Sequence, residues 1–206
     1  MKNPLKSLVS TPWLWNFVQV VLGAPTFKRE LYRSKLKKGS RLLDFGCASG
    51  HLADAFSDFD YTGIDLDSNA ISSAQERFKD KPNMRFIATD LHSRPFPAAS
   101  FDEVLFAATA HHLTDDLMRS LLKELHFCLK PGGTIHLFDP VFRPEDRFWQ
   151  RFFRAIDQGK YSRSTEQIIA LIESLRLFEI GTPSYYPPYG ALLQDCDFLY
   201  LPLKKP

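Results

Sequence analysis

LLDFGCASG, residues 42–50, decides the fold of this 206-residue chain. An apolar run that ends in an acid and runs into small residues is typical of a strand leading through a tight turn into a helix. The glycines at 46 and 50 permit backbone angles and a close approach that a side chain would block. The stretch therefore predicts a strand over 41–46, a ligand-binding turn, and a helix over 51–57 with unpaired N–H groups at its start.

Asp44 narrows the class of ligand that this turn can hold. A carboxylate before the turn would repel a pyrophosphate but would attract an ammonium group. The dinucleotide fingerprint would also need glycine at the position of His51. S-adenosylmethionine, whose methionyl end carries an amine and a carboxylate, fits the turn better than a dinucleotide does.

Composition limits the alternatives. A chain of 206 residues with 44% hydrophobic residues is expected to form one domain with a sizeable core. Its formal net charge of +2 is too small to imply a nucleic-acid partner. The three cysteines share no close spacing, so they predict neither a metal cluster nor a disulfide framework, and a reducing cytoplasm fits best. They are Cys47, Cys128 and Cys196.

Strands and helices alternate after Gly39. Besides the strand at 41–46, strands are predicted at 60–66, 84–89, 101–107 and 133–139, with helices at 51–57, 68–79 and 115–130. A capping box at Ser164 begins a helix through Leu175, and two last strands near 178–185 and 197–203 would pair antiparallel. The predicted fold class is α/β: a Rossmann-like, doubly wound, mostly parallel seven-stranded sheet with an antiparallel C-terminal edge hairpin.

We expect a single domain over 1–206 with four parts. These are an N-terminal helical cap (1–39), a cofactor-binding core (40–140), a helical insert or lid (141–163), and a C-terminal helix and strand pair (164–206). Within the cap, the apolar patch at 13–22 is too short to span a bilayer and is interpreted as part of a helix over 12–22. The basic stretch 28–41 is interpreted as a solvated helix face rather than a contact with phosphates or a membrane.

Acidic residues follow the second and third predicted strands. Ligands of open parallel sheets bind at the carboxyl ends of the strands. Asp65 stands about 20 residues past the glycine loop, where an acid can bind ribose hydroxyls, although a helix cap is the alternative and Asp67 is the better cap. Asp90 could accept from an exocyclic amine such as that of adenine, with Leu91 against the ring, or could be a solvated loop acid.

Taken in order, five segments resemble the class I S-adenosylmethionine-dependent methyltransferases, in the small-molecule group related to ubiquinone and menaquinone methyltransferases. They are LLDFGCASG, GIDLD, the TDL turn, FDEVLF followed by HHL, and LKPGGTIHL, within residues 40–140. The resemblance implies that the first loop cradles the methionyl part, that Asp65 and Leu66 hold the ribose, and that Asp90 and Leu91 hold the adenine. It assigns Asp44, Gly46, Ala48 and Gly50 to the loop, and we place Ala107 with the cofactor site. Ala48 stands where the family usually has glycine.

The family transfers a methyl group by in-line displacement, for which the protein chiefly positions the reactants and excludes water. A general base is needed only where the nucleophile must lose a proton. His111, just past the fourth strand, is our candidate base, with structural packing as the competing interpretation and Asp139 as a weaker alternative.

Acceptor specificity is expected from segments outside the core. Aromatic and arginine residues in the N-terminal segment and the insert predict a lid over an apolar or aromatic acceptor. The candidate substrate contacts are Trp15, His112, Arg147, Trp149 and Tyr186. A Pro-Pro-Tyr sequence at 187–189 gives no support for a nucleobase acceptor, because that motif belongs directly after the fourth strand.

The sequence therefore predicts a cytoplasmic S-adenosylmethionine-dependent methyltransferase that acts on a small molecule, with oxygen slightly preferred as acceptor atom and no metal. Two alternatives stay open: a non-catalytic module that binds S-adenosylmethionine and a partner protein, and a nicotinamide-dependent enzyme on the same scaffold. The oligomeric state is left open.

Overall fold

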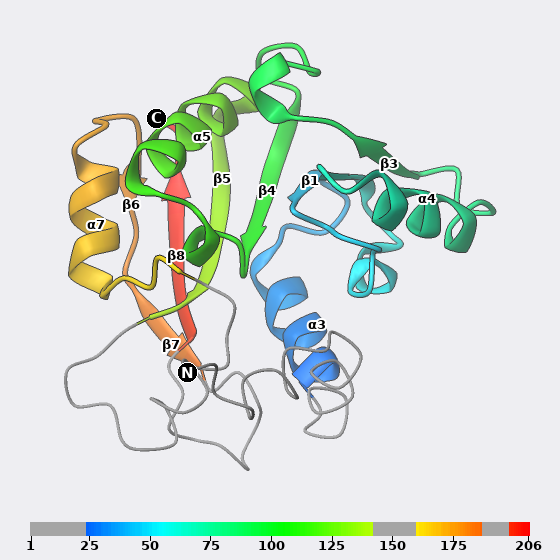
Figure 1. Ribbon diagram of the computed structural model, residues 1–206, viewed down its shortest axis with the longest axis horizontal. Coiled ribbons are helices and arrows are strands. Elements are labelled where there is room, and N and C mark those ends of the chain that lie inside the picture. The colour runs from blue at the N-terminus through cyan, green and yellow to red at the C-terminus, as the bar shows by residue number, and fades with distance from the viewer. Residues whose placement is uncertain (1–23, 142–159, 187–197) are drawn as a thin grey trace, which may run out of the picture.

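The computed structural model describes residues 24–141, 160–186 and 198–206 (Figure 1). The described strands are β1 (Arg41–Phe45), β2 (Asp60–Asp65), β3 (Met84–Ala88), β4 (Phe101–Ala107), β5 (Leu129–Pro140), β6 (Glu179–Ile180), β7 (Ser184–Tyr186) and β8 (Phe198–Lys204). The described helices are α3 (Ala24–Lys35), α4 (Ser68–Arg77), α5 (Asp115–Cys128) and α7 (Thr165–Glu173). Three 3₁₀ turns join them: η1 (Ala53–Phe56), η2 (Leu91–Ser93) and η3 (Ala110–His112).

The strands form one mixed sheet in the order β3-β2-β1-β4-β5-β8-β6, with β7 also paired to β8. Strands β1 to β5 pair in parallel, whereas β8 is antiparallel to β5, β6 and β7. This confirms the predicted α/β class, with a mostly parallel sheet and an antiparallel C-terminal edge. The direction of winding reverses between β1 and β4, so a ligand crevice is expected at their carboxyl ends.

The strand predicted over 178–185 is divided into β6 and β7, so the described residues form eight strands where seven were predicted. Both short strands pair with the same edge of β8. Gly181, between them, donates its N–H to the carbonyl of Pro202 at 2.9 Å. Pro183 has no N–H to donate, so the ladder is interrupted there.

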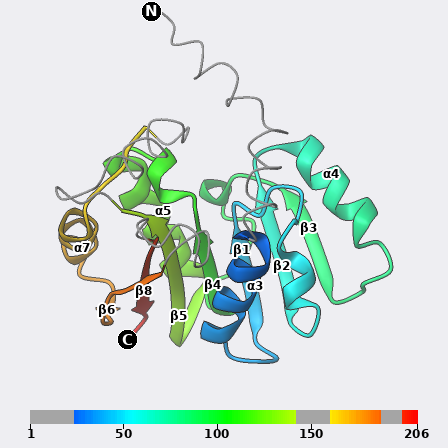
Figure 2. The same ribbon diagram turned by 90° about the horizontal axis from the view of Figure 1, so that it is seen from below.

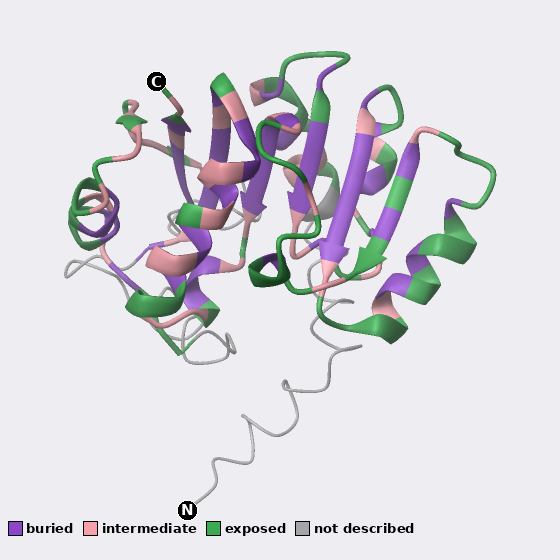
Figure 3. Ribbon diagram, turned by 90° about the horizontal axis from the view of Figure 1, so that it is seen from above, coloured by how far each residue is buried: buried purple, intermediate pink, exposed green. Residues whose placement is uncertain are grey.

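Two apolar cores lie on opposite faces of the sheet, because successive side chains of a strand point in opposite directions. Leu43 belongs to the core beneath α5 and α7, and its neighbour Leu42 to the core beneath α3 and α4. Figure 2 shows α3 against the sheet near β1, with α5 and α7 at the other side. In Figure 3 the strands are mostly buried, whereas the outward turns of α4 and α7 are exposed.

Side-chain caps fix where the helices begin. Asp67 accepts from the N–H groups of Asn69 and Ala70 at the start of α4, which confirms the cap expected there. Ser164 and Gln167 form the predicted reciprocal capping box of α7.

The helix predicted over 51–57 is wrong in type, since η1 is a four-residue 3₁₀ turn. Phe56, its last residue, and Phe59 are both buried, and the N–H of Phe59 bonds to the carbonyl of Phe56 at 3.0 Å, so the chain turns into β2 instead of continuing as a helix. The glycine loop consequently lacks an α-helix dipole, and its ligand-binding capacity rests on backbone N–H groups and acidic side chains.

The basic stretch after residue 28 lies largely on α3. Arg33 binds both carboxylate oxygens of Asp58, at 2.6 and 2.7 Å, while Leu31 and Tyr32 face the core. The helix is thus amphipathic, but only Arg33 of its cations is exposed as interpreted from the sequence. Lys28 and Lys35 are half-buried and lie over the rings of Phe198 and Tyr186. No helix among the described residues is long and apolar enough to cross a membrane.

Candidate active site

The glycine loop packs against the turn that follows β4. Gly46 and Gly50 have φ values of +78° and +70°, in the region that favours glycine. A Cβ on Gly46 would stand 2.8 Å from Oγ1 of Thr109. Ala48 also has a positive φ, 47°, which costs about 1 kcal/mol relative to an unstrained alanine. The loop is therefore held in one conformation with its backbone close to the carboxyl end of β4.

Asp44 is a buried carboxyl at the end of β1, with 8% of its surface exposed. The hydroxyl of Tyr61 donates to its Oδ2 at 2.7 Å. Burial raises the pKa of Asp44 to about 6; the hydrogen bond from Tyr61 opposes this effect and the charge of Asp65 adds to it. A cation placed beside Asp44 would favour its ionised form, which fits the ammonium group expected there.

Asp65 ties the end of β2 to the glycine loop. Its Oδ2 accepts the N–H of Ala48 at 2.9 Å, and its Oδ1 accepts the N–H of Asp67 at 3.0 Å. A carboxylate offers about four acceptor positions, so both oxygens retain capacity for ligand hydroxyls. Leu66, the next residue, is 76% exposed and available to a ligand.

Asp90 caps the 3₁₀ turn η2. Its Oδ1 accepts the backbone N–H of His92 at 2.9 Å and lies 2.9 Å from Nδ1 of the same ring. The backbone hydrogen bond, followed by the ring, lowers the pKa of Asp90. The carboxylate stays exposed to a ligand amine, whereas the side chain of Leu91 is 2% exposed and packs in the core beneath α5.

His111 and Asp139 form a buried pair at the carboxyl ends of β4 and β5. Nδ1 of His111 lies 2.8 Å from Oδ1 of Asp139, and each side chain is about 95% buried. Because a carboxylate only accepts hydrogen bonds, Nδ1 carries the proton and Nε2 is the basic nitrogen. The ring of the exposed His112 lies against it, with centroids 4.1 Å apart.

Tyr32 of α3 is buried against Phe138 near the end of β5, and sequence reasoning missed it. It is 1% exposed, and its ring centroid lies 4.4 Å from that of Phe138. Burial raises the pKa of its phenol, and the charges of Asp44 and Asp139 raise it further. The four-residue spacing of Tyr32 and Leu36 in a basic segment was the available signal of an inward helix face.

Of the remaining site residues predicted from the sequence, Ala107 and Tyr186 lie in the described part of the chain. Ala107 is half-buried at the end of β4, where its carbonyl accepts the hydroxyl of Thr109 at 2.9 Å. Tyr186 aligns with Phe198 at the same end of the sheet, with Nζ of Lys35 5.3 Å above its ring. Several predictions fall outside the described residues: the candidate contacts Trp15, Arg147 and Trp149, the helix over 12–22, most of the helical insert, and the Pro-Pro-Tyr sequence.

Comparison with known proteins agrees with this geometry. A family model described as a methyltransferase domain matches residues 42–133, which include the glycine loop, Asp65, Asp90 and the turn after β4. Over these residues the chain is similar to methyltransferase domains, as the resemblance to the class I S-adenosylmethionine-dependent methyltransferases implies.

A curated relative, the demethylmenaquinone methyltransferase of Staphylococcus aureus, is 27% identical over 151 residues, which are 68% of this chain. The match spans 62% of that relative's length.

The methyltransferase fold is also seen in solved structures. A 1,6-didemethyltoxoflavin-N1-methyltransferase of Burkholderia thailandensis matches with a TM-score of 0.72 and 18% identity, covering 98% of this chain and 87% of that one. A methyltransferase of Methanosarcina mazei matches with a TM-score of 0.69 and 18% identity, covering 85% and 96% of the two chains.

Proposed function

We propose that this chain transfers a methyl group from S-adenosylmethionine to a small-molecule acceptor in the cytoplasm, with His111 as general base. The observation that carries the proposal is the buried His111–Asp139 pair at the carboxyl ends of β4 and β5. It stands beside the turn that packs on the glycine loop of β1, so a base and a cofactor cradle share one edge of the sheet.

The residues of this edge fit S-adenosylmethionine. Asp44 would accept the ammonium group, Asp65 the ribose hydroxyls and Asp90 the adenine amine, while the exposed Leu66 would cover an apolar face of the ligand. The glycine loop packs so closely on Thr109 that Gly46 has no room for a Cβ, which leaves its backbone at the carboxyl ends of β1 and β4. When bound, the cofactor supplies a sulfonium whose methyl carbon is open to nucleophilic attack.

His111 is suited to take the proton of an acceptor hydroxyl. Asp139 orients the imidazole through Nδ1 and stabilises its positive charge after Nε2 receives a proton. A hydroxyl gains most from such a base, and we therefore favour oxygen as the acceptor atom. The name of the Staphylococcus aureus relative supports an apolar, quinone-like ring as the class of acceptor.

Calorimetry with S-adenosylhomocysteine tests the cofactor. We expect binding, and we expect Asp65→Ala to weaken it by about tenfold because the ribose loses a charged acceptor. Asp60→Ala, at a carboxylate paired with Arg41 at the other end of β2, is the matched control and should leave the affinity unchanged. Binding of NAD with indifference to S-adenosylhomocysteine would instead favour the nicotinamide-dependent alternative.

Methyl transfer from radiolabelled S-adenosylmethionine tests the base. Phenols, naphthoquinols and aromatic amines are to be supplied in turn as candidate acceptors, to the wild-type protein and to His111→Gln. We expect the variant to lose turnover by about 10² or more on hydroxyl acceptors while its affinity for S-adenosylhomocysteine stays within twofold. Full turnover of His111→Gln across pH 6–9 would remove His111 as base, and cofactor binding without transfer to any acceptor would favour a non-catalytic module.

A further inference from the structure

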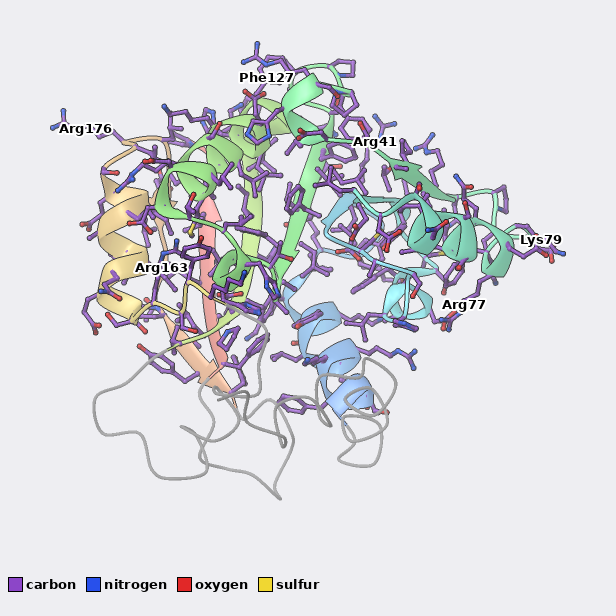
Figure 4. All side chains as sticks on the ribbon, in the orientation of Figure 1. Arg41, Arg77, Lys79, Phe127, Arg163 and Arg176 are labelled. Carbon is purple, nitrogen blue, oxygen red and sulfur yellow. The ribbon has the colours of Figure 1, made fainter. Side chains whose placement is uncertain are left out.

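A buried guanidinium stands behind the turn that carries His111. Arg163 precedes α7, and its side chain is only 8% exposed. Figure 4 places Arg163 beside the beginning of α7, near the end of the sheet where β4 and β5 finish.

Arg163 donates to carbonyls on both sides of His111. Nη1 binds the carbonyl of Ala110 at 3.0 Å, and Nη2 binds the carbonyl of Leu113 at 2.6 Å. The N–H of Tyr161 donates to the carbonyl of His111 itself at 3.0 Å. Segment 161–163 thus supplies hydrogen-bond partners to three carbonyls of the η3 turn.

The turn needs these partners because η3 is too short to satisfy its own carbonyls. Within it, the N–H groups of His112 and Leu113 bond to the carbonyls of Thr109 and Ala110. The carbonyls of His111 and Leu113 are the ones that depend on Tyr161 and Arg163, and Arg163 adds a second hydrogen bond at the carbonyl of Ala110. A buried carbonyl without a hydrogen-bond partner destabilises the folded state by about 1–3 kcal/mol. The turn would otherwise rearrange to reach water, and the His111 ring would move with it.

Arg163 is itself fixed against the residue that follows β5 and against the start of α5. Its backbone forms a bridge with Val141, directly after β5 and two residues past Asp139. Its Nε donates to Asp115 at 2.8 Å, at the start of α5. One residue therefore connects the His111 turn after β4 to the Asp139 end of β5.

We propose that Arg163 is a positioning residue that holds His111 in hydrogen-bond contact with Asp139. A lysine could not replace it, because a single ammonium group cannot reach two carbonyls and a carboxylate in the fixed plane of a guanidinium. The part concerning catalysis rests on the proposed function, whereas the positioning of the ring does not.

Nitrogen NMR of the histidine rings tests the positioning directly. In the wild-type protein we expect His111, assigned with His111→Gln, to show one tautomer with a proton on Nδ1. In Arg163→Ala and Arg163→Lys we expect that signal to change to averaged tautomers. His136, paired with Glu103 inside the sheet, is the internal control and should not change. An unchanged His111 signal in both folded variants would overturn the proposal.

A rescue experiment separates positioning from general loss of structure. Arg163 borders a cavity of about 560 Å³, also lined by Arg119 and Lys160, through which a small ion can enter. Guanidinium chloride at low concentration should restore the His111 signal of Arg163→Ala, whereas sodium chloride at equal ionic strength should not. Arg119→Ala, which removes a guanidinium paired at the surface with Asp116, should leave the signal as in the wild type.

Kinetics then distinguish this proposal from the proposed function. With an acceptor that the wild-type protein methylates, Arg163→Ala should lower kcat roughly tenfold to hundredfold and change its pH profile, with S-adenosylhomocysteine affinity within twofold. If the NMR signal changes but His111→Gln keeps full turnover, the positioning is confirmed and the base role fails. If Arg163→Ala does not fold, the Arg163→Lys spectrum decides, and a wild-type His111 signal in it contradicts the proposal.

Discussion

Asp44 is the residue at which stability and ligand binding oppose each other. Its pKa of about 6 in the folded protein is above the usual value near 3.8, so the folded state holds the proton more tightly than the unfolded chain does. The carboxyl therefore contributes stability that is fully present below pH 3.8 and is lost as the pH rises through 6. At pH 7 the protein carries a buried charge that costs about 3 kcal/mol, which an ammonium ligand can offset.

Replacing Asp44 by asparagine should reveal this opposition. We expect Asp44→Asn to unfold at higher denaturant than the wild-type protein at pH 7.5, because a neutral amide can still accept from Tyr61 without a buried charge. Affinity for S-adenosylhomocysteine should fall by about tenfold or more. In the wild-type protein we expect this affinity to rise between pH 5 and 7 as Asp44 ionises, and in Asp44→Asn we expect no such rise. Asp60→Asn is the control on the same sheet, and a stability gain there of the same size would count against the explanation.

Residue types at strand ends could be read from the sequence, but their burial could not. The sequence placed Asp67 correctly as a helix cap and placed Asp44 and Asp65 at neighbouring strand ends. It did not show that Asp90 caps η2 or that Leu91 is a core residue, because both depend on how η2 packs beneath α5. Arg163 was missed for a similar reason, since its partners lie about 50 residues earlier in the chain.

At the scale of elements, the apolar pattern was sufficient for the parallel strands and the capped helices. Strands β1 to β4 agree with their predicted ranges within one residue, and the Ser164 capping box is present. The pattern failed where an element is too short for periodicity to identify it. The 3₁₀ turn at Ala53–Phe56 depends on the burial of Phe56. The break between β6 and β7 depends on Pro183, which has no N–H to donate to β8.

Strands β4, β5 and β8 share a buried polar network that can be tested apart from the site. Nε2 of His136 lies 2.6 Å from Glu103, and Nδ1 lies 3.1 Å from the hydroxyl of Tyr200. We expect Glu103→Leu to lower the free energy of unfolding by about 2 kcal/mol, because His136 loses a buried partner.

The double variant Glu103→Leu/His136→Leu is the matched comparison. It should recover part of the loss measured in denaturant titrations, since both polar partners are replaced by apolar groups. S-adenosylhomocysteine affinity should stay within twofold in both variants. A double variant less stable than Glu103→Leu alone would show that the polar network has a different role.

At the scale of the whole molecule, the two ends of the parallel strands β1 to β5 carry different kinds of side chain. The amino ends carry ion pairs such as Arg41–Asp60 and Lys130–Asp102, at 2.8 and 2.7 Å. The carboxyl ends carry the glycine loop, the three acids and the His111 pair. Burial of both sheet faces by helices leaves the strand ends as the places where polar side chains can meet a ligand.

Hydrogen exchange with and without S-adenosylhomocysteine tests whether the ligand protects the carboxyl ends of the strands and not their amino ends. Protection should increase at the carboxyl ends, in peptides covering 44–50, 65–70, 89–92 and 107–112, because a ligand that binds only the folded state suppresses local opening around it. Peptides covering the amino ends, 36–41 and 96–102, should exchange as before. NAD at equal concentration should leave both sets unchanged, because Asp44 would repel its pyrophosphate. Equal protection of both sheet ends would place the ligand elsewhere and contradict the assignment of the cofactor to the β1–β4 switch point.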